Sequence, residues 1–158
     1  MNTEGARSVS YILFELAGST YGVKSVDVQQ LEMVEKITPV PNADSTVEGV
    51  VFSRGQVIPA ISLRARFGFE KIPFDLRTRL LVVRVGERNI GFIVDSAREF
   101  KNISDESIVP PPVALAATTG RYLDAIANLG ENTILLLDLE EVVRPNKSVL
   151  SAEEGNEL

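Results

Sequence analysis

The sequence predicts an all-β fold built from two small barrels with a few short helices, and three observations support this prediction. Ser10 to Leu31 and Arg79 to Phe100 share one pattern: an apolar strand, a turn with Gly, an aromatic-bearing strand and a short polar-apolar stretch. Gly49 to Leu63 and Asp124 to Leu139 form a second matching pair. The period of roughly 70 residues suits a duplicated small barrel better than a solenoid. Nearly every segment is also short and bounded by turn residues, so we expect two half-sized β units.

The first unit begins with a hairpin. Tyr11 to Leu16 alternates and meets a turn at residues 17–19 before the next strand. The prolines within Thr38 to Asn42 exclude a helix interior, so that segment is expected to be extended. Asp44 or Ser45 can cap a one-turn helix predicted over Thr46 to Glu48.

A second hairpin completes this unit. Strands are expected over Val50 to Phe52 and Gln56 to Ile61, about a turn at residues 53–55 that projects Arg54 from a rigid support. Leu63 to Phe67 is predicted to form a short helical turn, and residues 68–78 to form a loop.

The second unit repeats this order. Leu80 to Val85 is apolar and β-branched, with a turn at Gly86. Pro110 to Pro112 predicts a rigid connector, and Ala114 to Thr119 a loop of small residues. The last hairpin is expected over residues 126–137, followed by a short helix from Asp138 to Val143.

The composition removes several classes of function. The chain has no His and no Cys, which excludes Ser-His-Asp and Cys-His catalysis, zinc sites built on imidazole or thiolate, and haem ligation by either residue. A net charge of -6 disfavours nucleic acid, because phosphate binding requires clustered Lys and Arg. We therefore expect a protein partner, and no cofactor, metal site or catalytic residue.

The ends of the chain and its hydropathy bear on location. No apolar run approaches the roughly 20 residues that cross a bilayer. The opening MNTEGARSVS lacks the basic-then-apolar order of a secretory signal. We expect a cytoplasmic protein without direct membrane insertion, in which an ordered domain over residues 9–143 lies between flexible tails at 1–8 and 146–158.

This succession of segments resembles the CheW family of bacterial chemotaxis coupling proteins, from roughly Val9 to Val143. The segments that carry the resemblance are YILFELAGSTYGV, the Pro-Val-Pro-Asn linker, GVVFSRGQVIPAISLR, IGFIVD and ILLLDLEEVV. The resemblance implies two SH3-like five-stranded β-barrels with a hydrophobic seam between them. It also implies a non-catalytic adaptor that couples membrane chemoreceptors to the histidine kinase CheA, whose regulatory domain resembles CheW itself. Whether rings form with CheA or among CheW-like subunits alone is left open.

The resemblance assigns residues to two partners. A groove between the barrels is expected to receive the helical cytoplasmic hairpin of a chemoreceptor, with Arg54 standing at the Arg of the family's Asn-Leu-Arg-Gly motif. Positions implicated in coupling to the kinase are Gly49 and Val51. The receptor-side residues are Val28, Gln30, Leu31, Arg54, Arg79 and Phe100.

The chain departs from the family pattern at several of these positions. Gln30 stands where the family usually has a Glu placed to pair with the motif Arg. An amide can hydrogen-bond Arg54 but lacks the charge-assisted component. Phe52 and Ser53 replace Asn-Leu, and Ser62 replaces the Asp that usually precedes Leu-Arg. These departures indicate a divergent paralogue tuned to a particular receptor or kinase set.

Alternatives remain for several residues. Val28 and Leu31 share a face on a helix but not on a regular strand, and core packing explains them equally well. Phe100 at a strand end fits a packing role as well as an interface role.

A different class of function is also open. Asp95, Asp124 and Asp138 could serve a small-ligand or divalent-cation-binding protein, or an enzyme, that uses an inter-barrel carboxylate cleft. The simpler interpretation is that Asp95 and Asp138 each cap the amides of the turn that follows them.

Overall fold

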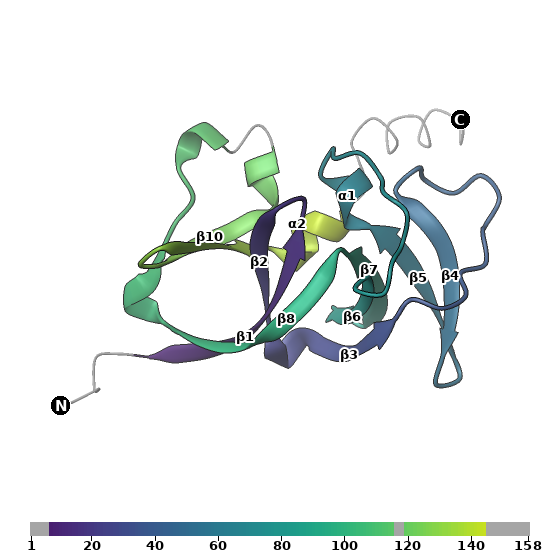
Figure 1. Cartoon of the computed structure of the whole chain (residues 1–158), viewed down its shortest axis with the longest axis horizontal. Coiled ribbons are helices and arrows are strands. Elements are labelled where there is room, and N and C mark those ends of the chain that lie inside the picture. The colour runs from purple at the N-terminus through teal and green to yellow at the C-terminus, as the bar shows by residue number, and fades with distance from the viewer. Residues whose placement is uncertain (1–6, 116–118, 145–158) are drawn as a thin grey trace.

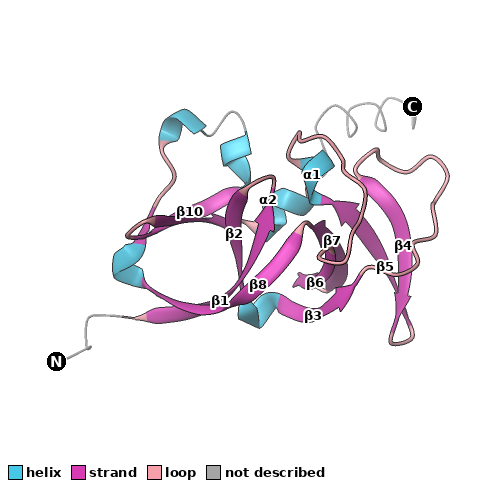
Figure 2. Cartoon of the chain, in the orientation of Figure 1, coloured by secondary structure: helices cyan, strands magenta, loops and turns pink. Residues whose placement is uncertain are grey.

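The structure is a computed structural model that describes residues 7–115 and 119–144, and it confirms the all-β prediction (Figures 1 and 2). The described strands form two sheets. Sheet A has the order β8 (Ser96–Ser104), β1 (Ser8–Leu16), β2 (Ser19–Lys24), β11 (Asn132–Leu137), β10 (Leu123–Leu129) and β9 (Ile108–Val109). Sheet B has the order β3 (Val28–Met33), β6 (Arg79–Val85), β7 (Arg88–Val94), β5 (Gln56–Ser62) and β4 (Val47–Ser53).

The helical elements are short. The α-helices are α1 (Leu63–Arg66) and α2 (Leu139–Val143). Single 3-10 turns lie at Ser25–Asp27, Asp105–Ser107, Val113–Leu115 and Thr119–Tyr122. None of the helices in the described ranges is long and apolar enough to cross a membrane.

The two halves of the chain exchange strands, so each sheet contains strands from both repeats. Hairpin β1–β2 lies in sheet A, but the next strand, β3, joins sheet B. Hairpin β6–β7 lies in sheet B, and its following strand, β8, joins sheet A. Hairpins β4–β5 and β10–β11 then attach to sheets B and A through the parallel pairs β5/β7 and β11/β2. The repeat is therefore present strand by strand, while sheet B is one continuous stretch, residues 28–94, and sheet A takes strands from both sides of it.

Two glycines explain why the repeat was visible in the sequence. Gly22 on β2 and Gly91 on β7 occupy equivalent strands beside the parallel pairs. A Cβ on Gly22 would lie 2.9 Å from a methyl of Leu136, and one on Gly91 would lie 2.7 Å from a methyl of Leu80. Both places require a residue without a side chain, because leucines from neighbouring strands fill the space.

The apolar core has three parts. One fills sheet A and includes Tyr11, Ile103 and Ile134. A second fills sheet B and includes Ile58, Leu80 and Val82. The largest lies between the sheets, and we call it the seam; its fully buried members include Phe14, Leu16, Leu63, Leu81, Val83, Phe92 and Val142.

The seam is a closed core rather than an open groove. Four aromatic rings lie in a row across it, with successive ring centroids 5.7, 5.7 and 4.9 Å apart: Phe14, Tyr21, Phe67 and Tyr122. The outer two pairs are stacked and the middle pair is tilted. Helices α1 and α2 contribute buried side chains to one side of the seam. A partner therefore cannot enter between the sheets, and any groove must lie where the seam reaches the surface.

Two local predictions were wrong. Residues 46–48 do not form a helix: the Asp44 carboxylate accepts hydrogen bonds from the Thr46 amide and hydroxyl at 2.8 and 3.1 Å, which makes a turn, and β4 then begins at Val47. Pairing of β4 with β5 outweighs a single capped turn. Near the N-terminus, Ser8 already lies in β1, so this strand begins within residues 1–8, which were expected to form a flexible tail.

Candidate partner-binding surface

A β-bulge in β3 decides how Val28 and Leu31 are oriented. Val28 pairs with Val83 and Leu31 with Leu81, and the register shifts by one residue between Val28 and Gln30. Paired residues point to the same face of a sheet, and Val83 and Leu81 both belong to the seam. Val28 and Leu31 therefore share the seam-side face although they lie on a strand, because the bulge absorbs the extra residue.

Exposed apolar side chains continue this face at the edges of both sheets. Met33 pairs with Arg79 beyond Leu31, and on β8 Phe100 pairs with Ile12, another seam residue. The exposed fractions are 45% for Leu31, 51% for Met33 and 69% for Phe100. We call Val28, Leu31, Met33 and Phe100 the rim. Strands β3 and β8 run along the side of the molecule opposite α1 and α2, so neither of these two helices covers the rim (Figure 1).

Gln30 points away from the rim. It pairs with Val82, which faces the interior of sheet B. Its side-chain oxygen lies 2.9 Å from the Ser53 hydroxyl, which also lies 2.6 Å from a carboxylate oxygen of Glu32. The expected contact between Gln30 and Arg54 is therefore replaced by a contact with Ser53, and this polar group joins the edge strands β3 and β4 through side chains.

Arg54 and Arg79 differ in their surroundings. Arg54 occupies a two-residue turn with Gly55, with φ values of 52° and 79°, as the predicted hairpin requires. It is exposed and has no hydrogen-bond or ion-pair partner within the described ranges. Arg79 is half-buried, and its Nη1 donates to the carbonyls of Leu76 and Thr78 at 2.7 and 3.0 Å. Arg54 is thus available to a partner, whereas Arg79 holds the end of loop 68–78.

Gly49 and Val51 lie below the surface. Val51 is 7% exposed and belongs to the core of sheet B. Gly49 has a φ of 150°, and a Cβ there would lie 2.2 Å from the Thr38 carbonyl oxygen. That carbonyl accepts a hydrogen bond from the Val50 amide at 2.8 Å, and the Thr38 amide donates one to the Val50 carbonyl at 2.9 Å. Gly49 therefore lets the segment before β4 cross closely over that strand.

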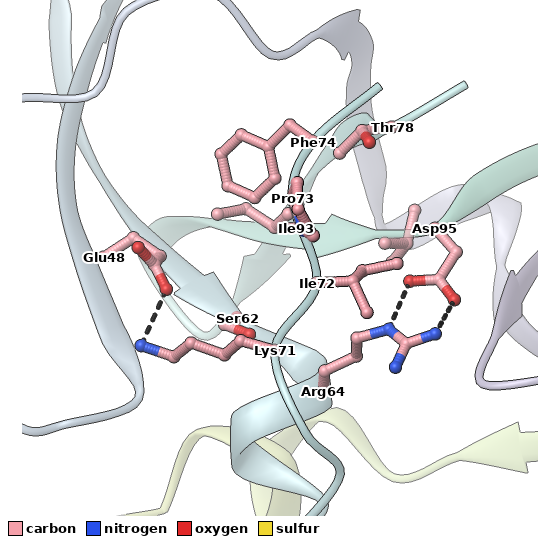
Figure 3. Close-up of a pocket in the computed structure, with 11 residues that line it drawn as sticks. Glu48, Ser62, Arg64, Lys71, Ile72, Pro73, Phe74, Thr78, Ile93 and Asp95 are labelled. Carbon is pink, nitrogen blue, oxygen red and sulfur yellow. Dashed lines mark hydrogen bonds and ion pairs between the residues drawn. The ribbon is translucent and has the colours of Figure 1, made fainter. Parts of the chain in front are cut away.

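Asp95 forms an ion pair with Arg64 (Figure 3) and also accepts a hydrogen bond from the turn between two strands of sheet A. Arg64 Nε and Nη2 donate to its two oxygens at 2.8 and 2.7 Å, and the Ala17 amide in the β1–β2 turn donates at 2.9 Å. Partial burial alone would raise the pKa of Asp95, but the hydrogen bonds from Arg64 and Ala17 and the charge of Arg64 outweigh it and hold that pKa below its usual value. Asp95 therefore links the two sheets through these hydrogen bonds rather than capping the turn that follows it.

This ion pair lines a pocket of about 280 Å³ beneath loop 68–78. Lys71 closes the opposite side through a contact of 2.9 Å with Glu48. Ile72, Pro73 and Phe74 supply apolar walls (Figure 3). Because each charged side chain in the pocket has a partner of opposite sign, the pocket offers no unpaired charge to a ligand.

The three carboxylates do not converge. Asp124 and Asp138 line a different pocket, of about 290 Å³, together with the cations Lys24 and Arg84. Asp138 accepts from the Glu141 amide at 3.3 Å and caps α2, as predicted. Within the described ranges no group of three acidic side chains is placed to hold a metal ion.

Sequence reasoning missed Met33, Glu32 and Arg64. The apolar-polar-apolar order of Leu31, Glu32 and Met33 could have revealed Met33, because residues two apart on a strand share a face. The contacts of Glu32 and Arg64 depend on strands far apart in the chain, and no local pattern carries them.

The fold and surface define a class: an all-β domain of two strand-exchanged sheets with an exposed apolar rim at their edges. The CheW-like domain family matches residues 10–146. This chain belongs to that family.

Similar proteins agree with this assignment. A chemotaxis protein CheW of Klebsiella aerogenes is 27% identical over 140 residues, covering 89% of this chain and 84% of the relative. A CheW of Helicobacter pylori is 30% identical over 138 residues, covering 86% and 82%. Protein FrzA of Myxococcus xanthus is 26% identical over 135 residues, covering 85% and 84%. The crystal structure of the scaffolding protein TtCheW from Thermoanaerobacter tengcongensis superposes with a TM-score of 0.82 at 29% identity, covering 89% of this chain and 95% of that chain.

Proposed function

We propose that this protein is a non-catalytic adaptor that couples the cytoplasmic helical hairpin of a chemoreceptor to the regulatory domain of a CheA-type histidine kinase. The observation that carries the proposal is the rim, which presents exposed apolar side chains from the edge strands of both sheets. Membership of the CheW-like family supports the same role. The protein would act in the cytoplasm and reach the membrane only through its receptor.

The rim suits a helical partner. A helix laid against a surface is recognised by apolar anchors spaced along one of its faces. Leu31, Met33 and Phe100 offer such contacts from two strands, and Val28 supports them from a half-buried position. Arg54 adds an unpaired cation at the hairpin tip beside β3. Gln30 would act indirectly, because its side chain fastens the tip through Ser53.

The kinase side would use a separate surface. Gly49 and Val51 are buried, so they would act by shaping the segment that crosses β4 rather than by touching the kinase. An adaptor of this kind needs two surfaces at once, so that the state of the receptor can bias the kinase. A ring made of CheW-like subunits alone would use the same kinase-side surface.

The test is a binding assay with purified components. Leu31→Asp and Phe100→Asp should each abolish capture by a receptor hairpin while leaving kinase binding and circular dichroism unchanged. Val113→Asp is the matched control, because Val113 is 90% exposed on a 3-10 turn outside the rim. Equal receptor capture by the rim variants and the control would refute the proposal.

A further inference from the structure

The tip of hairpin β4–β5 carries an exposed apolar pair that the assignments above leave unused. Phe52 and Val57 face each other across the hairpin, with Cα partners in register. They are 75% and 57% exposed, although their neighbours Val51 and Ile58 are buried. Arg54 lies in the turn between them. An aromatic ring, a branched aliphatic side chain and a guanidinium on a rigid turn are residue types suited to a binding contact.

This tip is continuous with the rim. A groove of about 360 Å³ lies between β3 and β4. Its apolar lining comes from Met33, Val51, Phe52 and Leu80, and the polar residues Glu32, Glu35, Lys36 and Thr38 complete it. Ser53 fixes the two sides relative to each other through its contacts with Gln30 and Glu32. A partner lying along the rim would therefore reach the groove and the tip without leaving the surface.

The side chain at position 30 keeps Arg54 available. The Ser53 hydroxyl has one proton and two acceptors, the Gln30 amide oxygen and the Glu32 carboxylate. A carboxylate at position 30 would place two negative groups at one hydroxyl, which is unfavourable. The neutral amide avoids that repulsion and leaves no second carboxylate beside the turn to neutralise Arg54.

We propose that Phe52, Val57 and Arg54 form a specificity contact in which the receptor helix seats an apolar side chain in the groove between Met33 and Phe52 and presents a carboxylate to Arg54. This inference rests on the proposed function and names the chemistry of its partner. Charge at the tip supports the carboxylate, because Arg54 is an exposed cation that has no hydrogen-bond or ion-pair partner among the described residues. Continuity with the rim supports the helix as the occupant.

The equivalent hairpin β10–β11 supplies the replacement residues for a test. Asn128 and Thr133 face each other there in the same register as Phe52 and Val57. The double variant Phe52→Asn, Val57→Thr copies this polar pair into the tip. It should weaken binding to a receptor hairpin fragment about tenfold or more, as loss of an interface anchor does, and leave kinase binding unchanged.

Charge is tested separately. Arg54→Glu should weaken hairpin binding at least as much, and the salt dependence of binding should fall. Arg88→Glu, on an exposed arginine at the start of β7, is the charge-matched control and should change binding less than twofold. Replacing the acidic residues of the hairpin fragment one at a time by Lys should identify one position that restores binding to the Arg54→Glu variant.

The outcomes separate the two proposals. If Leu31→Asp abolishes hairpin binding but the tip variants bind like the unchanged protein, the adaptor function stands and the specificity contact is refuted. If Arg54→Glu and Arg88→Glu weaken binding equally, the partner carboxylate is refuted. If the unchanged protein binds no receptor hairpin, both proposals fall.

Discussion

Hairpins β4–β5 and β10–β11 occupy equivalent places in the two sheets but present different surfaces. Each is followed by a short helix and pairs in parallel with the second strand of the other repeat. At the tip of β4–β5 the facing residues are Phe52 and Val57, whereas at the tip of β10–β11 they are Asn128 and Thr133. All four positions are exposed, so packing does not dictate the choice. Only one copy of a duplicated hairpin carries the apolar side chains that a partner could bind.

The covering of the two hairpins differs as well. In sheet A, strand β9 pairs with Ile126 and Ala127 of β10. In sheet B, the corresponding cover is a single bridge between Thr38 and Val50 of β4. A covered sheet edge is protected from further pairing, and a less covered one is accessible. The comparison indicates that duplication supplied two similar scaffolds, and that one tip was then free to become a contact surface.

The largest expected effect comes from making β4 resemble β10 at one position. Gly49 on β4 corresponds to Ala125 on β10, which already carries a Cβ. Gly49→Ala should lower the free energy of unfolding by about 3 kcal/mol, because the new Cβ would meet the Thr38 carbonyl in a backbone conformation that favours glycine. Chemical denaturation measures this change. Ala125→Gly should cost only about 1 kcal/mol, and equal losses would break the comparison.

The second effect concerns the contacts of Asp95, which accepts hydrogen bonds from Arg64 and from the Ala17 amide of the other sheet. Asp95→Asn should cost about 2 kcal/mol at neutral pH, because Arg64 loses the carboxylate to which it donates. The pKa of Asp95 is depressed in the folded state, so its stabilisation is present above the ordinary carboxyl pKa of about 3.9 and disappears as pH falls through the lower folded value.

Unfolding curves measured over pH 2 to 7 test whether the ion pair of Asp95 with Arg64 stabilises the fold. The difference in the free energy of unfolding between the unchanged protein and Asp95→Asn should disappear below about pH 4. Asp124→Asn, which removes an equal charge from an exposed position, is the control. A gap that stays constant across this range would mean that the ion pair does not stabilise the fold.

The helix caps should give smaller and similar effects. Ser62 accepts from the Ala65 amide at the start of α1, as Asp138 accepts from the Glu141 amide at the start of α2. Ser62→Ala and Asp138→Ala should each lower the free energy of unfolding by about 1 kcal/mol, as loss of a capping side chain does. If the two losses differ from each other by more than about 1 kcal/mol, the two helix caps are not energetically equivalent.

The smallest expected effect is on stability at the two hairpin tips. Phe52→Asn and Asn128→Phe should each change the free energy of unfolding by less than about 0.5 kcal/mol, because both side chains are exposed. Thermal melts monitored by circular dichroism will measure both. A large loss for Phe52→Asn would mean that this ring supports the fold rather than a partner.

Local signals in the sequence predicted the hairpins and two short helices, although the one-turn helix predicted over Thr46 to Glu48 is absent. Turns at residues 17–18 and 54–55 were identified because Gly permits the positive φ that a two-residue turn requires. The helix caps at Ser104 and Asp138 follow the same local chemistry. Elements governed by neighbouring residues can be read from the sequence.

Long-range features could not be predicted in this way. The exchange of strands depends on parallel pairs such as Thr20 with Ile134, and no local pattern specifies them. The bulge that brings Val28 and Leu31 to one face is a defect in register against β6. The contacts of Gln30 and Asp95 likewise depend on residues brought close by the fold, so the family resemblance could indicate positions but not their partners.

Along the chain, the strands of sheet B lie between the first two strands of sheet A and its remaining strands. This order has a consequence for synthesis on the ribosome. Every strand of sheet B is available once residue 94 has emerged, so this sheet can fold while the rest of the chain is still being made. The first hairpin, β1–β2, must wait for β8 and for β11 at residues 132–137. During that interval its seam-side residues have no complete partner surface. The nascent chain thus exposes the apolar β1–β2 hairpin until residues 132–137 have emerged, which is the period when it is most open to chaperones and to misassembly.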